Sequence, residues 1–439
     1  MDYQEKVITV KQALSLIKTN DIIVSGMVGA EAREILSHLH ELDASIKNVS
    51  VTNCLPMLDA DFFVKPEHAK RFHVDSWFLS GALRKGWSNG TTSFIPNHLH
   101  LAATARLDHV RPNIYIGCAT PPDEHGFVSL SVSNVYEKRM IEEAGVVILE
   151  LNPNFPRTFG DMELHISQVN YVIPVNYPVP EIPDQELTEK DIKIGNTIAS
   201  FIKDGDCLQL GIGGIPNAVA NALVNKRDLG VHTEMLTSGF MKLWNAGAIS
   251  NKYKTINRGK MVCCFVAGPK ALYDFVDNNP SILILDGRYV NDPYVIGQND
   301  NQVSINATLE VDVTGQCCSE SIGSRQWSGT GGQVDTVLGA QLSKGGRSFI
   351  ALYSTAMVRN PATGVKEEIS TIVPQLKPGA VVTTCRNDVH YIVTEYGAVN
   401  LRGCSVAERV EKLISIAHPK FRDQIRKESI ALGLLPAEE

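Results

Sequence analysis

The sequence predicts an α/β protein made of two related open α/β domains, in which mostly parallel sheets are flanked by helices. Three observations predict this fold class. The chain of 439 residues is longer than one ordinary core requires. It contains an internal repeat, and its apolar residues gather in short uninterrupted runs that are typical of strands covered on both faces.

The internal repeat has the order helix, buried strand, glycine turn, helix. In the first copy an amphipathic helix over residues 9–18 precedes a strand at 21–25 and a second helix at 31–36. The second copy has the corresponding segments at 190–203, 206–210 and 217–223. Each copy has an Asp followed by Gly five and eight residues later, namely Asp21, Gly26 and Gly29, and Asp206, Gly211 and Gly214. This order is typical of a parallel sheet with helices on both faces.

Further strands follow from the remaining apolar runs. Their continuous character favours central strands over half-exposed ones, at residues 114–118, 146–151, 281–285, 349–353 and 391–394. The stretch 174–189, which is rich in proline and acidic residues, is the best candidate for a linker. We therefore expect an N-terminal domain over residues 1–183 and a C-terminal domain over residues 184–439.

Charge and composition argue against several classes of partner. Lys and Arg (41) against Asp and Glu (48) give a net charge of −7 without a block of like charge, so nucleic acid is a poor partner. The charged N-terminus lacks the apolar stretch of a signal peptide, and no run approaches about twenty apolar residues. Nine cysteines include no CxxC pair, which favours buried thiols over disulfides or zinc. These features predict a cytoplasmic protein that does not enter a membrane.

A glycine loop at residues 211–216 lies where a predicted strand meets a predicted helix. Such a loop presents backbone N–H groups at the positive end of a helix and lets a ligand approach closely. The alternative is a tight turn without a ligand, and a glycine loop taken alone favours that alternative. The glycine spacing does not fit the dinucleotide-binding fingerprint.

Glu234 lies in the segment 231–239, where residues 233–236 are predicted to be the strand that follows the helix after this loop. A carboxylate at the carboxyl edge of a parallel sheet is where ligands bind in open α/β folds. It could act as a nucleophile, a general base or a structural group, and its position alone favours the structural group.

Two other segments contain candidate ligand-binding residues. The glycine cluster 329–335 predicts N–H donors for an oxyanion, with a hairpin or loop crossing as the alternative. The segment 344–347 contains Lys344 and Arg347, which are candidates for phosphate binding or residues of a surface turn. His125 is expected to be a structural loop residue.

A series of segments, taken together and in order, resembles the family I CoA-transferases of the acetyl-CoA hydrolase/transferase branch. They are residues 123–130, 208–216, 232–235, 289–293, 329–335, 393–397, 401–403 and 417–419. The resemblance covers nearly the whole chain and implies the duplicated fold of that family. Two departures concern the site: Ser238 stands where relatives usually have Asp, and the N-terminal loop 25–31 differs from the form in well-known members.

The resemblance implies roles for particular residues. Glu234 is expected to be the nucleophile that forms a glutamyl-CoA thioester. The CoA-binding residues it implies are Leu210, Gly211, Ile212, Gly213, Gly214, Leu309, Gly332 and Lys344. Asn291 matches an asparagine that places the acyl group, and Glu395 matches a supporting carboxylate. CoA is then a substrate, no tightly bound cofactor or metal is expected, and relatives suggest a homodimer or a dimer of dimers.

The implied reaction transfers CoA between a short-chain acyl-CoA and a carboxylate such as acetate, with acids of the butyrate or 4-hydroxybutyrate type. A carboxylate nucleophile suits this exchange, because its anhydride can break towards either side at similar energy. The N–H groups of Ile212 and Gly332 are candidate oxyanion donors. Two alternatives remain: an acyl-CoA hydrolase that uses the same site, and a non-catalytic ligand-binding protein of the same fold.

Overall fold

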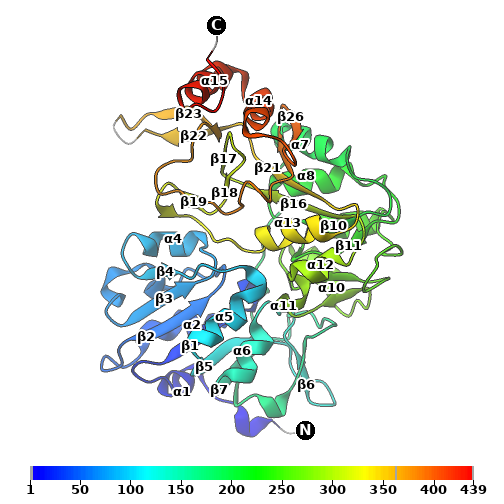
Figure 1. Ribbon diagram of the computed structural model, residues 1–439. Coiled ribbons are helices and arrows are strands. Elements are labelled where there is room, and N and C mark those ends of the chain that lie inside the picture. Colours follow the sequence, from blue (N-terminus) through cyan, green and yellow to red (C-terminus); the bar gives the residue numbers. More distant parts are fainter. Residues whose placement is uncertain (1–2, 361–362, 438–439) are drawn as a thin grey trace.

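The computed structural model describes residues 3–360 and 363–437 and contains two large sheets, one in each half of the chain. Figure 1 shows the first half, coloured blue to cyan, below the second half, coloured green to red. The prediction of an α/β fold with mostly parallel sheets is confirmed. In the described ranges, no helix is both long and apolar enough to cross a membrane.

The sheet of the first half has seven parallel strands. Their order across the sheet is β4 (Thr92–Phe94), β3 (Phe72–Ser76), β2 (Val49–Asn53), β1 (Ile22–Ser25), β5 (Ile114–Ala119), β7 (Val146–Leu151) and β9 (Tyr171–Pro174). One face is covered by α1 (Val10–Ser15), α2 (Arg33–His38), α3 (Asp61–Val64) and α4 (Gly81–Trp87). The other is covered by α5 (Ala102–His109) and α6 (Glu137–Glu143). Successive residues of β1 point to opposite cores, as expected of a strand buried on both faces.

The main sheet of the second half has six strands, of which only the last is antiparallel. The order is β11 (Gly230–Val231), β10 (Cys207–Leu210), β16 (Gln302–Ala307), β21 (Arg347–Ala351), β25 (Tyr391–Thr394) and β26 (Gly397–Asn400). The helices of this half are α7 (Glu189–Ala199), α8 (Gly214–Ala222), α9 (Ser238–Asn245), α10 (Lys270–Val276), α11 (Gly287–Val290), α12 (Pro293–Gly297), α13 (Gln333–Leu342), α14 (Val406–Ile416) and α15 (Arg422–Ala431).

Small strand pairs complete the fold. The pairs are β6 (Phe127–Ser129) with β8 (Glu163–His165), β12 (Met235–Leu236) with β14 (Phe265–Val266), β13 (Met261–Cys263) with β15 (Ile282–Ile284), β19 (Ser321–Ile322) with β20 (Arg325–Gln326), and β22 (Thr355–Arg359) with β23 (Lys366–Ser370). A sheet of three strands has β17 (Glu310–Asp312) between β18 (Cys317–Cys318) and β24 (Ile372–Val373). Of the five additional strands predicted, four lie inside the main sheets. The fifth, at residues 281–285, is also a strand, but β15 pairs with β13 outside the six-stranded sheet, so its expected place as a central strand was wrong.

The repeat extends to individual hydrogen bonds. Asp21 Oδ2 accepts from the N–H of Lys18, and Asp206 Oδ2 accepts from the N–H of Lys203, both at 2.7 Å. Each Asp therefore closes the turn that leads from a helix into the first strand of its copy. The helices before these turns also begin alike, since Thr9 and Thr188 each form a capping box.

The two halves share a core. One apolar cluster contains buried residues from both large sheets, while a second lies within the first half and a third within the second half. Backbone pairing also joins the halves, because Val266 N donates to Val132 O at 2.8 Å and Asn134 N donates to Cys264 O at 2.9 Å. The seam between the halves is therefore packed like an interior.

The predicted linker crosses this seam as an ordered strap over residues 175–188. The N–H of Ile182 donates to Gly268 O, and Tyr273 Oη donates to Pro180 O at 2.7 Å. Asp184 accepts from Ser238 Oγ and pairs with Lys242. Ser238 thus helps to hold the strap.

Candidate active site

A cavity of about 180 Å³ lies where the carboxyl ends of strands from both halves face each other. The first half supplies an apolar wall from the loops that follow its strands, with Met27, Cys54, Leu55, Phe78 and Leu99. The second half supplies the ends of β10 and β16, Glu234 and the loop 328–333. This is the edge at which open α/β sheets bind ligands.

Glu234 lies in a break between β11 and β12 rather than inside the continuous strand predicted over residues 233–236. Its carbonyl oxygen accepts from the N–H groups of both Cys264 (3.0 Å) and Phe265 (3.3 Å). Two residues of the neighbouring segment therefore face one residue here, which is the pattern of a β-bulge. Bulges redirect a side chain next to a functional site, and the Glu234 side chain lines the cavity with partial exposure.

One oxygen of the Glu234 carboxylate is held by the protein. Asn291, which is buried at the end of α11, donates from Nδ2 to Oε2 at 2.6 Å. The Cys264 thiol lies 3.2 Å from Glu234 O and 3.6 Å from Asn291 Oδ1, so the amide oxygen of Asn291 faces a donor. In the described part of the chain, Oε1 makes no hydrogen bond. Oε1 is the oxygen that is available to a ligand.

Burial raises the pKa of Glu234 to about 7. The hydrogen bond from Asn291 opposes this pKa shift, the charge of Asp335 adds to it, and the Gly332 N–H also favours the ionised form. A carboxylate with a pKa near neutrality, at the end of a strand and beside a cavity, is a candidate for catalysis.

The glycine cluster 329–332 lies in one of the loops of the second half that contact the first half. Leu79 N donates to Ser328 O and Leu99 N donates to Gly331 O, both at 3.2 Å. A Cβ at Gly329 would lie 2.5 Å from the Trp77 carbonyl oxygen, and one at Gly332 would overlap Oε2 of Glu234. Glycine is therefore needed at these two positions, because the loop backbone passes too close to Trp77 and Glu234 to leave room for a side chain. The Gly332 N–H, predicted as an oxyanion donor, favours the ionised carboxylate of Glu234 in this structure.

The first glycine loop forms the other lip of the cavity. Gly213 has a φ of +111° and precedes α8, and Ile212 is 50% exposed beside it. Within the described residues, the N–H of Ile212 has no acceptor. Ile212 also lines a groove of about 310 Å³ that contains Leu309 and Gly214. Leu210, Gly211, Ile212 and Gly332 therefore meet Glu234 at one cavity, and Leu309 lies along the adjoining groove.

Two predicted residues lie elsewhere. Lys344 O accepts from Asn301 N at the beginning of β16, the opposite end of the sheet from Ala307, and a strand of that length spans about 20 Å. Glu395 follows β25, three strands from β10, where it accepts from Ser354 and pairs with Lys190 at 3.2 Å. Neither residue lines the cavity.

Of the apolar wall, only the N-terminal loop 25–31, which contains Met27, was expected at the site, and that expectation came from the family resemblance; the other wall residues were not predicted. Met27, Cys54 and Phe78 each come just after a strand of the first half, so their position at a carboxyl edge was the available signal. Nothing in the sequence shows that this edge faces the second half. In the described ranges, no cluster of three or more His, Cys, Asp or Glu could hold a metal ion.

Comparison with known proteins gives consistent matches along the chain. The acetyl-CoA hydrolase/transferase N-terminal domain matches residues 1–183, and the C-terminal domain of that family matches residues 268–429. The chain is 40% identical to the succinyl-CoA:cyclohexane-1-carboxylate CoA transferase of Geobacter metallireducens over 428 residues, 97% of this chain and 95% of the relative. It is also 40% identical to the 4-hydroxybutyrate coenzyme A transferase of Clostridium kluyveri over 427 residues, 97% of each. The crystal structure of RipA from Yersinia pestis is 36% identical with a TM-score of 0.91, covering 99% of this chain and 100% of that one.

Proposed function

Because the chain belongs to the acetyl-CoA hydrolase/transferase family and is a CoA-transferase, we propose that it works through a Glu234–CoA thioester. It exchanges CoA between a short-chain acyl-CoA, of the butyrate or 4-hydroxybutyrate type, and a carboxylate acceptor such as acetate. The observation that carries this proposal is the Glu234 carboxylate itself, which lines the cavity between the halves and has Oε2 held by Asn291.

The proposed cycle uses Oε1 as the nucleophile. Oε1 attacks the acyl carbonyl carbon, the C–S bond breaks with its electrons on sulfur, and an acyl-glutamyl anhydride and CoA thiolate result. The thiolate then attacks Cδ of Glu234, the anhydride C–O bond breaks, and the first acid leaves as its carboxylate. The acceptor carboxylate repeats these steps in reverse. No proton is transferred, so the site needs no general acid.

The protein's part is to stabilise charge and to exclude water. The Ile212 N–H lies at the positive end of α8 beside the cavity and is the donor we assign to the oxyanion. The apolar wall contains Met27, Cys54 and Leu99, each at most 3% exposed. A dry wall protects the anhydride and the thioester from hydrolysis, which favours transfer.

The lining favours a monocarboxylic acid. In the described part of the chain, no Lys, Arg or His side chain lines the cavity, and Glu234 is its only ionisable carboxylate. The distal carboxylate of a dicarboxylic acid would be taken out of water without a cation beside it, which is costly.

Trapping of the thioester tests this function. The protein is incubated with acyl-CoA without acceptor, treated with borohydride and digested. We expect mass spectrometry to find the Glu234 side chain reduced to an alcohol, with no such product from Glu234→Gln. An unmodified Glu234 peptide in the wild-type protein would contradict the proposal. If free CoA is released equally fast with and without acetate, the protein is a hydrolase. If Glu234→Gln keeps full function, the protein is a non-catalytic ligand-binding protein.

Three further parts of the proposal concern the whole protein. We divide the chain into domains at residues 1–183 and 184–439, which is supported by a separate large sheet in each part. A cytoplasmic location is supported by nine free cysteines, seven of them buried. A homodimer or dimer of dimers follows from the family resemblance, and the mass in solution tests it.

A further inference from the structure

His232 is buried two residues before Glu234, and both side chains reach the end of the same short helix. The Nε2 atom of His232 lies 2.8 Å from the carbonyl oxygen of Val290, the last residue of α11. Since a carbonyl can only accept, Nε2 carries the proton. The next residue is Asn291, which donates to Glu234. The segment that carries the nucleophile is thus joined to the end of α11 at two adjacent points.

The protonation of His232 suits a fixed donor and not a proton carrier. Burial, with the charge of Lys254 adding to it, lowers the pKa of His232 to about 3. The imidazole is therefore neutral at physiological pH, and its single N–H is committed to Val290. Gln302 Nε2 donates to the His232 carbonyl oxygen at 3.1 Å and fixes the backbone from the other side.

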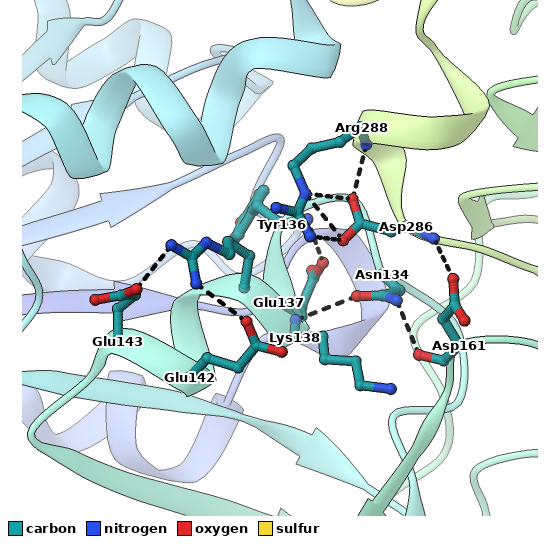
Figure 2. A network of polar contacts seen from close by, with 10 residues as sticks. Asn134, Tyr136, Glu137, Lys138, Glu142, Glu143, Asp161, Asp286 and Arg288 are labelled. Atoms are coloured by element: carbon teal, nitrogen blue, oxygen red, sulfur yellow. Dashed lines mark hydrogen bonds and ion pairs between the residues drawn. The ribbon is translucent and has the colours of Figure 1, made fainter. Parts of the chain in front are cut away.

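The other end of α11 is fixed by the first half of the chain. Gly287 N donates to Asn134 O at 2.9 Å, and Asp286 N donates to Asp161 Oδ2 at 3.2 Å. Figure 2 shows the Asn134 side chain held within the first half, with its amide donating to Asp161 O and its side-chain oxygen accepting from Lys138 N, and shows the contact of Asp286 with Asp161. A helix of only four residues does not hold itself in water. Its direction is set by these anchors at its start and by His232 at its end.

From this geometry we propose that His232 is a positioning residue for the nucleophile. Its Nε2–H holds Val290 so that Asn291 binds Oε2 of Glu234 and leaves Oε1 directed at the acyl carbonyl. The inference rests on the proposed function and adds to it a residue that touches neither substrate nor CoA. Without this hydrogen bond, the end of α11 shifts and the Glu234 carboxylate is no longer held in the orientation that attack requires. Substrate binding itself is not expected to change.

A matched pair of substitutions tests the proposal. The amide nitrogen of a glutamine can occupy the place of Nε2, whereas that of an asparagine falls near Nδ1. We expect His232→Gln to form the Glu234 thioester within about fivefold of the wild-type rate, and His232→Asn to lose roughly 10–100-fold in kcat with little change in KM. Equal losses in the two variants would overturn the proposal.

A double-mutant cycle separates positioning from general destabilisation. If His232 acts through Asn291, the His232→Asn, Asn291→Ala double variant should be no slower than Asn291→Ala alone. Additive losses would contradict this. His390 is the control, because it is also buried with a lowered pKa but lies before β25 at the far end of the sheet. His390→Asn should leave the rate unchanged, and a comparable loss there would overturn the inference.

The remaining outcomes are also decisive. If His232→Asn does not fold, thioester formation by His232→Ala is measured with and without imidazole, and restoration by imidazole is expected. Absence of restoration in a folded Ala variant would overturn the proposal.

If the wild-type protein itself forms no thioester at Glu234, the proposed function fails. If the wild type forms it and the His232→Asn variant forms it equally fast, only this inference fails.

Discussion

At the scale of single residues, the site depends on how one carboxylate is kept ionised while it is enclosed. Burial raises the pKa of Glu234 to about 7, and Asn291 opposes that effect. Only the ionised form is a nucleophile. Asn291 therefore has two effects, on the orientation of the carboxylate and on the fraction that is ionised.

The pH dependence of thioester formation follows from this balance. As the pH rises through about 7, Glu234 ionises and the rate constant should increase. Asn291→Ala removes a hydrogen bond to the charged form, so its rising limb should move upward by about one to two pH units. Single-turnover rates with acyl-CoA between about pH 5.5 and 8.5 measure the rising limb in the wild type and in the variant. An unchanged limb in the variant would contradict the role of Asn291.

At the scale of elements, the loop 328–332 connects the active site to the first half. Its glycines fit against the Trp77 carbonyl oxygen and against the Glu234 carboxylate, and its carbonyls accept from Leu79 and Leu99. The loop thus places the start of α13 at the site only while the first half is in place.

Gly329→Ala tests this contact. The added Cβ would lie 2.5 Å from the Trp77 carbonyl oxygen, and a backbone atom cannot move aside cheaply. We expect at least a tenfold loss of kcat/KM as the loop shifts from Glu234. Gly81→Ala is the matched control, since a Cβ there meets nothing within 4 Å and its backbone φ is ordinary. Similar losses in the two variants would show that the seam does not position the loop.

At the scale of the whole molecule, the shared core makes the cavity a joint property of both halves. The first half gives the apolar wall, and the second gives the carboxylate and the amides. Buried carboxyl groups in the first half hold its loops: Glu137 accepts from Met27 N at 2.9 Å, and Glu150 accepts from Tyr177 Oη at 2.6 Å. Glu150 thus ties β7 to the strap that crosses the seam.

The composition of the cavity predicts which acids react. Among the described residues, no Lys, Arg or His side chain lines the cavity. Butyrate should therefore accept CoA from acetyl-CoA with a kcat/KM at least about tenfold higher than that of succinate. A panel of short mono- and dicarboxylic acids at equal concentration provides the measurement. Equal rates for the two classes would mean that a charged group reaches the acid by another route.

The buried Glu150 also predicts how stability depends on pH. Burial raises its pKa from 4.5 to about 7, so the folded state binds the proton more tightly than the unfolded state. This contribution is complete below about pH 4.5 and is lost as the pH rises through about 7. Its loss costs up to about 3 kcal/mol. When the pH is raised from about 5 to about 8, the thermal unfolding midpoint of the wild type should therefore decrease more than that of Glu150→Gln. Equal decreases in the two proteins would contradict this prediction.

Much of the fold could be predicted from the sequence because its signals are local. Continuous apolar runs and the Asp and Gly spacing of the repeat identify strands and turns, and both copies keep the same hydrogen bonds around Asp21 and Asp206. Local patterns failed where a partner decides the outcome. The bulge at Glu234 depends on the segment 264–265, and β15 lies outside the main sheet because β13 is its neighbour.

By itself, the sequence determined the fold class, the repeat, the glycine loop at 211–214 and the candidacy of Glu234. Only the tertiary structure decided which groups meet that carboxylate. It brought Asn291 and Gly332 to Glu234, placed Lys344 about a strand's length away, and built the apolar wall from the first half. The physical reason is that spacing along the chain sets the periodicity and the local turns. Contacts between distant segments depend instead on how the two halves pack, with the carboxyl ends of their strands facing each other.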